Sequence, residues 1–105
     1  MKDFQVIFNY VDINRSQSLE AFLKKELTSL SEKYNFIHRA DVFLRRDNRS
    51  DGKNSLCEIR LSAPGPRLYA DTNAEDFRSA TKETIRDLTD QLQKRKREFT
   101  AGIGS

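Results

Sequence analysis

Basic side chains recur along one side of the helix that the sequence predicts for residues 72–97. Between residues 78 and 97 there are seven bases against three acids. At about 100° per residue, five of the bases fall in one sector of the helix, namely Arg78, Lys82, Arg86, Lys96 and Arg97. Because a row of cations can neutralise successive phosphates, this pattern favours a nucleic-acid interface.

The other sides of the same helix carry different residue types. The acids Glu83, Asp87 and Asp90 occupy a sector of their own. An apolar stripe faces the predicted core and consists of Phe77, Thr81, Thr84, Ile85, Leu88 and Leu92. An ordinary solvated surface held by i,i+4 ion pairs is the alternative explanation for the charges. The like charges of Lys82 and Arg86 at that spacing argue against it.

Residue types suited to catalysis or metal binding are scarce. His38 is the only histidine and Cys57 the only cysteine; they belong to different predicted strands, and Cys57 faces the core. No cysteine–histidine spacing suits zinc, and Gly65 lies between two prolines, so it belongs to a turn and not to a phosphate-binding loop. We therefore expect no enzymatic activity, no metal, no cofactor and no small-molecule substrate.

The composition is typical of a small soluble intracellular protein. A chain of 105 residues with 36% hydrophobic and 33% charged residues suits one domain with one core. The net charge of +3 is a mild basic bias that suits an acidic partner. One cysteine allows no internal disulfide, and neither a signal peptide nor a membrane-spanning run is recognisable. We expect a cytoplasmic protein without membrane contact.

Alternating hydrophobic residues predict four strands, at residues 4–11, 40–45, 55–62 and 67–71. Between the second and third strands, residues 47–54 are rich in turn formers and predict a mobile hairpin loop. Residues 63–66 (Ala-Pro-Gly-Pro) predict a tight reversal before the fourth strand.

Helical spacing predicts two helices. The first follows the N-cap residue Ser16 and repeats apolar residues as far as Tyr34, with Asn35 closing it. The second is capped by Thr72 or Asn73, with Glu75 and Asp76 in its first turn. Residues 99–105 have no pattern and predict a short flexible tail after a single domain of residues 1–98.

The predicted order is therefore β-α-β-β-β-α. The first crossover is long enough for a helix, so the first two strands can be parallel, and the last three form an antiparallel meander. Both helices have one apolar face, which places them on the same side of the sheet in a two-layer α+β sandwich similar to a double-stranded RNA-binding domain. The other face of the sheet holds Phe43, Arg45, Glu58, Arg60 and Tyr69.

Several segments in this order match those of a known family. The first helix (SLEAFLKKELTSLSEKY) is followed by Ala-Asp-Val-Phe-Leu at residues 40–44, Ala-Pro-Gly at 63–65 and Leu-Tyr-Ala at 68–70. The most specific segment is Glu75-Asp76-Phe77 followed by Ala80, at the start of the second helix. With these segments the chain resembles the ribosome hibernation-promoting factor and ribosome-associated inhibitor (protein Y) family, in its short form.

The resemblance implies a function without a reaction. Members of this family bind the small ribosomal subunit between head and body, overlap the mRNA channel and the tRNA sites, and silence idle ribosomes under stress or slow growth. It implies ribosomal RNA as the partner and a monomer away from the ribosome. A stand-alone RNA-binding module and a protein-interaction transcription modulator on the same fold are the alternatives.

The expected RNA contacts come from both helices. Two departures from the family are expected: Asp87 and Asp90 stand where many relatives have bases, and we expect no additional ribosome-dimerising domain after the second helix. The predicted RNA-binding residues are Arg78, Lys82, Arg86, Lys94, Arg95, Lys96 and Arg97 of the second helix, with Lys25 and Lys33 of the first.

Overall fold

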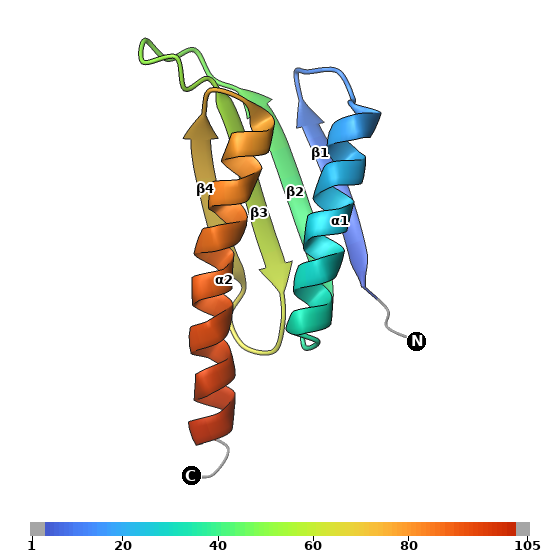
Figure 1. Cartoon of the computed structure of the whole chain (residues 1–105), viewed down its shortest axis with the longest axis vertical. Helices are drawn as coiled ribbons and strands as arrows, with labels where there is room; N and C mark the ends of the chain where they lie inside the picture. The colour runs from blue at the N-terminus through green and yellow to red at the C-terminus, as the bar shows by residue number, and fades with distance from the viewer. Residues whose placement is uncertain (1–3, 103–105) are drawn as a thin grey trace.

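The computed structural model describes residues 4–102 and has the predicted order β-α-β-β-β-α (Figure 1). Its elements are β1 Gln5–Val11, α1 Gln17–Lys33, β2 Arg39–Arg46, β3 Ser55–Ser62, β4 Leu68–Ala74 and α2 Phe77–Gly102. Both helices cover the same face of the four-stranded sheet, and the other face is left uncovered (Figure 1). The predicted two-layer α+β sandwich is confirmed.

The strands lie in the sheet in chain order, β1-β2-β3-β4. β1 and β2 are parallel, with Gln5 opposite Arg39, as expected for a pair joined by a helical crossover. β2, β3 and β4 form the predicted antiparallel meander. α1 lies over the β1–β2 half and α2 over the β3–β4 half, so the two helices run side by side along the sheet (Figure 1).

The core lies between the helices and the sheet and follows the predicted periodicities. Its fully buried members include Leu23, Leu27, Val42, Leu44, Ile59, Leu61, Leu88 and Leu92. Thr84 is buried with them because its hydroxyl donates to the carbonyl oxygens of Ala80 at 2.8 Å and of Cys57 at 3.3 Å. Cys57 is itself buried, as predicted, and burial raises its thiol pKa to about 11, which suits a structural residue and not a nucleophile.

The start of α1 confirms the predicted cap. The hydroxyl of Ser16 accepts a hydrogen bond from the amide of Leu19 at 3.3 Å, and its carbonyl accepts from the amide of Glu20. The helix ends at Lys33 with Tyr34 as C-cap, one residue before the expected end at Asn35.

The start of α2 differs from the prediction. β4 continues to Ala74, which pairs with Ser55, so Thr72 and Asn73 belong to the strand and cannot cap the helix. The side-chain amide of Asn73 donates instead to Asp47 at 2.7 Å. Asp76 is the capping residue: its carboxylate accepts from the amide of Ser79 at 2.8 Å and from the Ser79 hydroxyl at 3.1 Å. Sheet pairing therefore delays the helix until Phe77.

Because Asp76 caps α2, its removal should destabilise the protein in a pH-dependent way. The Ser79 amide hydrogen bond is the main cause that lowers the pKa of Asp76 below its usual 3.8. A depressed carboxyl pKa stabilises the fold above the unfolded pKa, and this contribution disappears as pH falls through the folded pKa. Asp76→Ala should lower the melting temperature by a few degrees at pH 7, and the gap to the parent should narrow below about pH 4. Asp76→Asn, which keeps a capping oxygen, is the matched control, and its melting temperature at pH 7 should fall less than that of Asp76→Ala.

The end of α2 also differs from the prediction. The helix continues to Gly102, so the expected flexible tail does not begin at Phe99. The ring of Phe99 packs edge-on against Phe36, with centroids 5.1 Å apart, and Phe36 in turn contacts Tyr34. This aromatic contact extends the ordered helix past its last leucine. The remainder of the expected tail, residues 103–105, lies outside the described residues.

The loop between β2 and β3, residues 47–54, is closed by polar contacts. The amide of Asp47 donates to the carbonyl of Asn54 at 2.8 Å, and the amide of Arg49 donates to the Asn54 side chain at 2.9 Å. Gly52 has φ +80°, a conformation that glycine adopts without strain.

Candidate nucleic-acid interface

The predicted cations lie on the two helices, and all but one of them are exposed. The exposed cations of α2 are Arg78, Lys82, Arg86, Lys94, Lys96 and Arg97, and those of α1 are Lys25 and Lys33. Both helices cover the same face of the sheet (Figure 1), so their exposed cations belong to the side of the molecule opposite the open sheet face. We call this side the helix side.

Aromatic rings of α1 and of its C-cap, Tyr34, hold some of these cations where the two helices meet. The guanidinium carbon of Arg78 lies 4.9 Å from the ring centroid of Phe22. The ammonium groups of Lys33 and Lys96 lie 5.7 and 6.0 Å from the centroid of Tyr34. A cation over a ring is positioned without being neutralised, so it still attracts an anion. The contacts of Arg78 and Lys96 cross from α2 to α1, which forms a positive seam between the helices.

Sequence reasoning missed Arg46, a further cation of this side. It is the last residue of β2, is exposed, and its guanidinium carbon lies 5.1 Å from the ring centroid of Phe77 at the start of α2. Strand alternation could have identified it, because Arg46 shares the parity of Val42 and Leu44, which face the helices.

The exposed cations of the helix side have no carboxylate partner. In the described part of the chain, no ion pair involves any of the eight helix cations or Arg46. Lys82 comes closest to having such a partner. Its charge helps to lower the pKa of Asp76, but it contributes less than the hydrogen bonds from Ser79. These cations are therefore available to an external polyanion.

Three arginines of the open sheet face, in contrast, are paired with acids two residues away in the chain. Arg39 binds Asp41 at 2.8 Å, and Arg60 binds Glu58 at 2.9 Å. Arg45, at the end of the same face, binds Asp47 at 3.0 Å. Residues i and i+2 of a strand point to the same side, which makes these pairs possible. The two faces therefore differ in how many of their cations are compensated by acids.

Arg95 is the exception among the predicted residues, because it is engaged with the β3–β4 turn. Its guanidinium donates to the carbonyl oxygens of Pro64 at 2.7 Å and Pro66 at 2.9 Å, and its side chain is only 13% exposed. Arg95 follows Phe77 by 18 residues, which is five full helical turns, so it returns to the core side of α2. This spacing and the nearby Pro-Gly-Pro could have revealed a structural role.

The Arg95 contact makes Gly65 more sensitive to substitution than an equivalent glycine. Both Gly65 and Gly52 have positive φ, +91° and +80°, but a Cβ at Gly65 would lie 3.0 Å from Arg95 Nη1, whereas nothing lies within 4 Å at Gly52. Gly65→Ala and Gly52→Ala should each lose about 1–2 kcal/mol of unfolding free energy from backbone strain. Gly65→Ala should lose about 1 kcal/mol more, because Arg95 must give up a hydrogen bond.

Chemical denaturation of these variants would measure the difference. In an Arg95→Ala background the extra cost at Gly65 should vanish, while the cost at Gly52 should stay unchanged. If the extra loss of unfolding free energy at Gly65 persists without Arg95, the contact between Arg95 and the turn is not its cause.

Lys94 also departs from the expected pattern, although it is exposed. At 100° per residue it falls in the sector of Glu83, Asp87 and Asp90, away from the seam. It therefore lies beside the acids and contributes less to a continuous positive surface than Arg78 or Lys96.

Other chemistry is sparse in the described part of the chain. Residues 4–102 contain no group of three or more histidine, cysteine or acidic side chains that could hold a metal ion. Over the same residues, neither helix combines the length and apolar character that crossing a bilayer requires.

Comparisons with known proteins agree with this arrangement. Among the solved structures that share the fold are two that cover most of this chain. The chain superposes with a TM-score of 0.75 on a ribosomal subunit interface protein from Coxiella burnetii, with 16% identity over 88% of this chain and 97% of that one. It superposes with a TM-score of 0.70 on the N-terminal domain of Thermus thermophilus Protein Y, with 20% identity over 90% of this chain and 98% of that one.

At the level of sequence, no curated protein matches the chain. A family model, however, matches residues 6–100, described as sigma 54 modulation protein / S30EA ribosomal protein. The match spans both helices as far as Thr100 and all of the sheet except Gln5. The chain therefore belongs to the sigma 54 modulation protein / S30EA ribosomal protein family, whose members are ribosome-associated.

Proposed function

We propose that this protein is a hibernation factor that binds the small ribosomal subunit with its helix side and blocks the decoding cleft in stress or slow growth. The observation that supports this proposal is the asymmetry of charge compensation. Exposed cations of the helices lack carboxylate partners within the described chain, whereas Arg39, Arg45 and Arg60 of the sheet are paired. Ribosomal RNA offers the dense phosphates that unpaired cations attract.

The form of the molecule suits recognition of RNA shape. The protein measures 49 × 31 × 17 Å, and its cations are spread along two neighbouring helices. Phosphate contacts position a protein on RNA without reading its sequence. We propose that Arg78, Lys82, Arg86, Lys96 and Arg97, with Lys25, Lys33 and Arg46, make these contacts, and that Arg95 supports them by holding the end of α2.

The proposed inhibition is steric and has no turnover. A protein in the decoding cleft excludes mRNA and tRNA while it stays bound, and the same ribosome works again after it leaves. The protein is proposed to act in the cytoplasm, where ribosomes are, and to be a monomer when free.

Co-sedimentation with purified small subunits at increasing salt tests the interface. If about five cations each neutralise one phosphate, a plot of log affinity against log salt concentration should have a slope of about −3 to −5. The protein should bind an isolated RNA duplex more weakly than it binds the small subunit at every salt concentration. A flat salt response would contradict phosphate contacts, and equal affinity for any duplex would favour a stand-alone RNA-binding module.

A further inference from the structure

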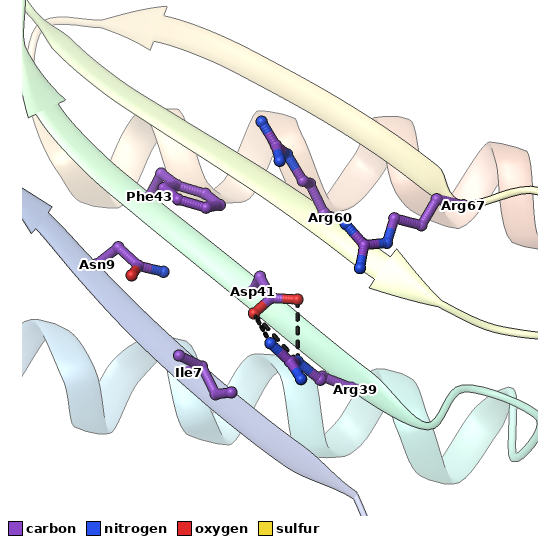
Figure 2. A pocket seen from close by; sticks show the side chains of 7 residues that line it. All are labelled: Ile7, Asn9, Arg39, Asp41, Phe43, Arg60 and Arg67. Carbon is purple, nitrogen blue, oxygen red and sulfur yellow. Dashed lines mark hydrogen bonds and ion pairs between the residues drawn. The ribbon is translucent and has the colours of Figure 1, made fainter.

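The open face of the sheet has a hollow of about 280 Å³, and none of the residues that line it belongs to a helix. Figure 2 shows the side chains that line it, which come from β1, β2, β3 and the residue just before β4. Three of these side chains are arginines and only one, Asp41, is an acid. The hollow is therefore locally positive on a face whose arginines are otherwise paired with acids.

Arg67 is the source of the positive excess. Arg39 is held by the carboxylate of Asp41, and Arg60 by Glu58 from outside the hollow. In the described part of the chain, Arg67 has no ion pair and no side-chain hydrogen bond. Its guanidinium reaches from the start of β4 across β3 toward Asp41 (Figure 2). An anion can thus bind Arg67 without displacing an existing partner.

The arginine beside it is already fixed in place. The guanidinium carbon of Arg60 lies 4.9 Å from the ring centroid of Phe43 and 5.9 Å from that of Tyr69. Its Nε donates to Glu58 at 3.1 Å. A side chain held on three sides loses little conformational freedom when a ligand arrives.

The opposite end of the hollow offers an aromatic ring and an amide. Phe43 is half-buried, and Asn9 lies opposite it on β1, whereas Ile7 lies opposite Asp41. The side-chain nitrogen of Asn9 donates to the Val42 carbonyl at 3.3 Å, which leaves its oxygen and one N–H without a partner among residues 4–102. Such a group can donate and accept at the edge of a nucleobase, while the ring of Phe43 provides a surface for stacking.

We propose that this hollow binds one nucleotide unit. Its phosphate would lie at Arg67, since arginine matches phosphate oxygens with several N–H donors. Asp41 lies between the two ends, and a carboxylate there can accept hydrogen bonds from ribose hydroxyls. The base would lie against Phe43 and Asn9. The volume is close to the lower limit of small-molecule sites, which suits a single nucleotide.

An NMR titration with 5′-mononucleotides tests the site. Adenosine, guanosine, cytidine and uridine 5′-monophosphates, the four nucleosides and inorganic phosphate would be compared on the isotope-labelled protein. We expect at least one nucleotide to shift the signals of Asn9, Phe43 and Arg67 and to bind about tenfold or more tightly than its nucleoside or phosphate alone. Equal shifts with phosphate alone, or shifts confined to the helices, would overturn the proposal.

Matched variants separate the hollow from the rest of the surface. Arg67→Ala should weaken nucleotide binding about tenfold or more, because it removes the one unpaired guanidinium of the hollow. Arg45→Ala removes the same side chain from the same face outside the hollow and should change the affinity less than about twofold. Tight binding that survives Arg67→Ala would overturn the assignment of the phosphate.

The nucleotide unit could be free or part of an RNA strand, and a trinucleotide distinguishes the two. Equal affinity per site for mononucleotide and trinucleotide assigns a free nucleotide, and much tighter trinucleotide binding at the same residues assigns a strand. The result is independent of the proposed ribosome interface, because glutamate substitutions at Arg78, Lys82 and Arg86 should leave the nucleotide titration unchanged.

Discussion

Replacing Arg78, Lys82 and Arg86 together by glutamate should reduce co-sedimentation with small ribosomal subunits to background. The triple variant reverses three charges on the exposed side of α2 and turns attraction to phosphates into repulsion. If each lost contact is a charged hydrogen bond of about 1.5–3 kcal/mol, the affinity should fall by about a thousandfold or more. The fold should persist, because all three side chains are exposed.

The acidic sector of the same helix supplies the matched control. Changing Glu83, Asp87 and Asp90 to alanine alters the same number of exposed positions but removes negative charge. Binding to small subunits should stay equal or become tighter. Loss of binding in this variant, with binding kept in the glutamate variant, would place the functional face elsewhere. Circular dichroism of both proteins would verify that α2 is intact.

Addition of the purified protein to a cell-free translation extract should stop protein synthesis at about one molecule per small subunit. A steric block has no turnover, so inhibition should follow occupancy and saturate at stoichiometry. Ribosomes loaded beforehand with mRNA and initiator tRNA should be protected, because the two ligands compete for one space. Excess mRNA and tRNA should also reverse an inhibition already established.

Inhibition at trace concentrations, with cleaved or modified ribosomal RNA, would be the signature of an enzyme and would exclude a steric block. Arg67→Ala provides a useful comparison in the same extract. It alters the open sheet face and leaves the helix side unchanged, so it should inhibit like the parent protein. The glutamate variant of α2 should not inhibit.

The sheet and the core of this fold were predictable because local patterns and long-range packing agree. Alternation in residues 55–62 gave the bounds of β3 without error, and the cap at Ser16 placed the start of α1. Helical spacing also placed Leu88 and Leu92 in the core. In these segments one apolar face dictates both the element type and its orientation.

The ends of α2 were mispredicted because tertiary contacts decide them. Thr72 and Asn73 are suitable caps by residue type, but pairing with β3 retains them in the sheet. Phe99 has no periodic partner in sequence, and its partner Phe36 is more than 60 residues away. No local pattern contains either contact.

For the charged residues as well, sequence patterns predicted which side of the helix they occupy but not which groups they contact. Helical spacing placed Arg78, Lys82 and Arg86 on one exposed side, where the structure also has them. It could not tell that Arg95 binds the Pro64 and Pro66 carbonyls, since these belong to a turn about 30 residues earlier. Whether a cation has a carboxylate partner likewise depends on where the side chains lie in three dimensions, and a count of charges in the sequence cannot predict it.

The pairing of arginines with acids on the sheet has a consequence for how the protein approaches its target. Arg39 and Arg60 form closed ion pairs whose fields cancel within a few ångströms, whereas the charges at the helices extend into solvent. The net charge of +3 is therefore placed unevenly, and the protein has a dipole moment whose positive end is at the helices. In the field of a polyanion such a molecule rotates during diffusion, so most encounters begin with the helices in front and the association rate rises at low ionic strength.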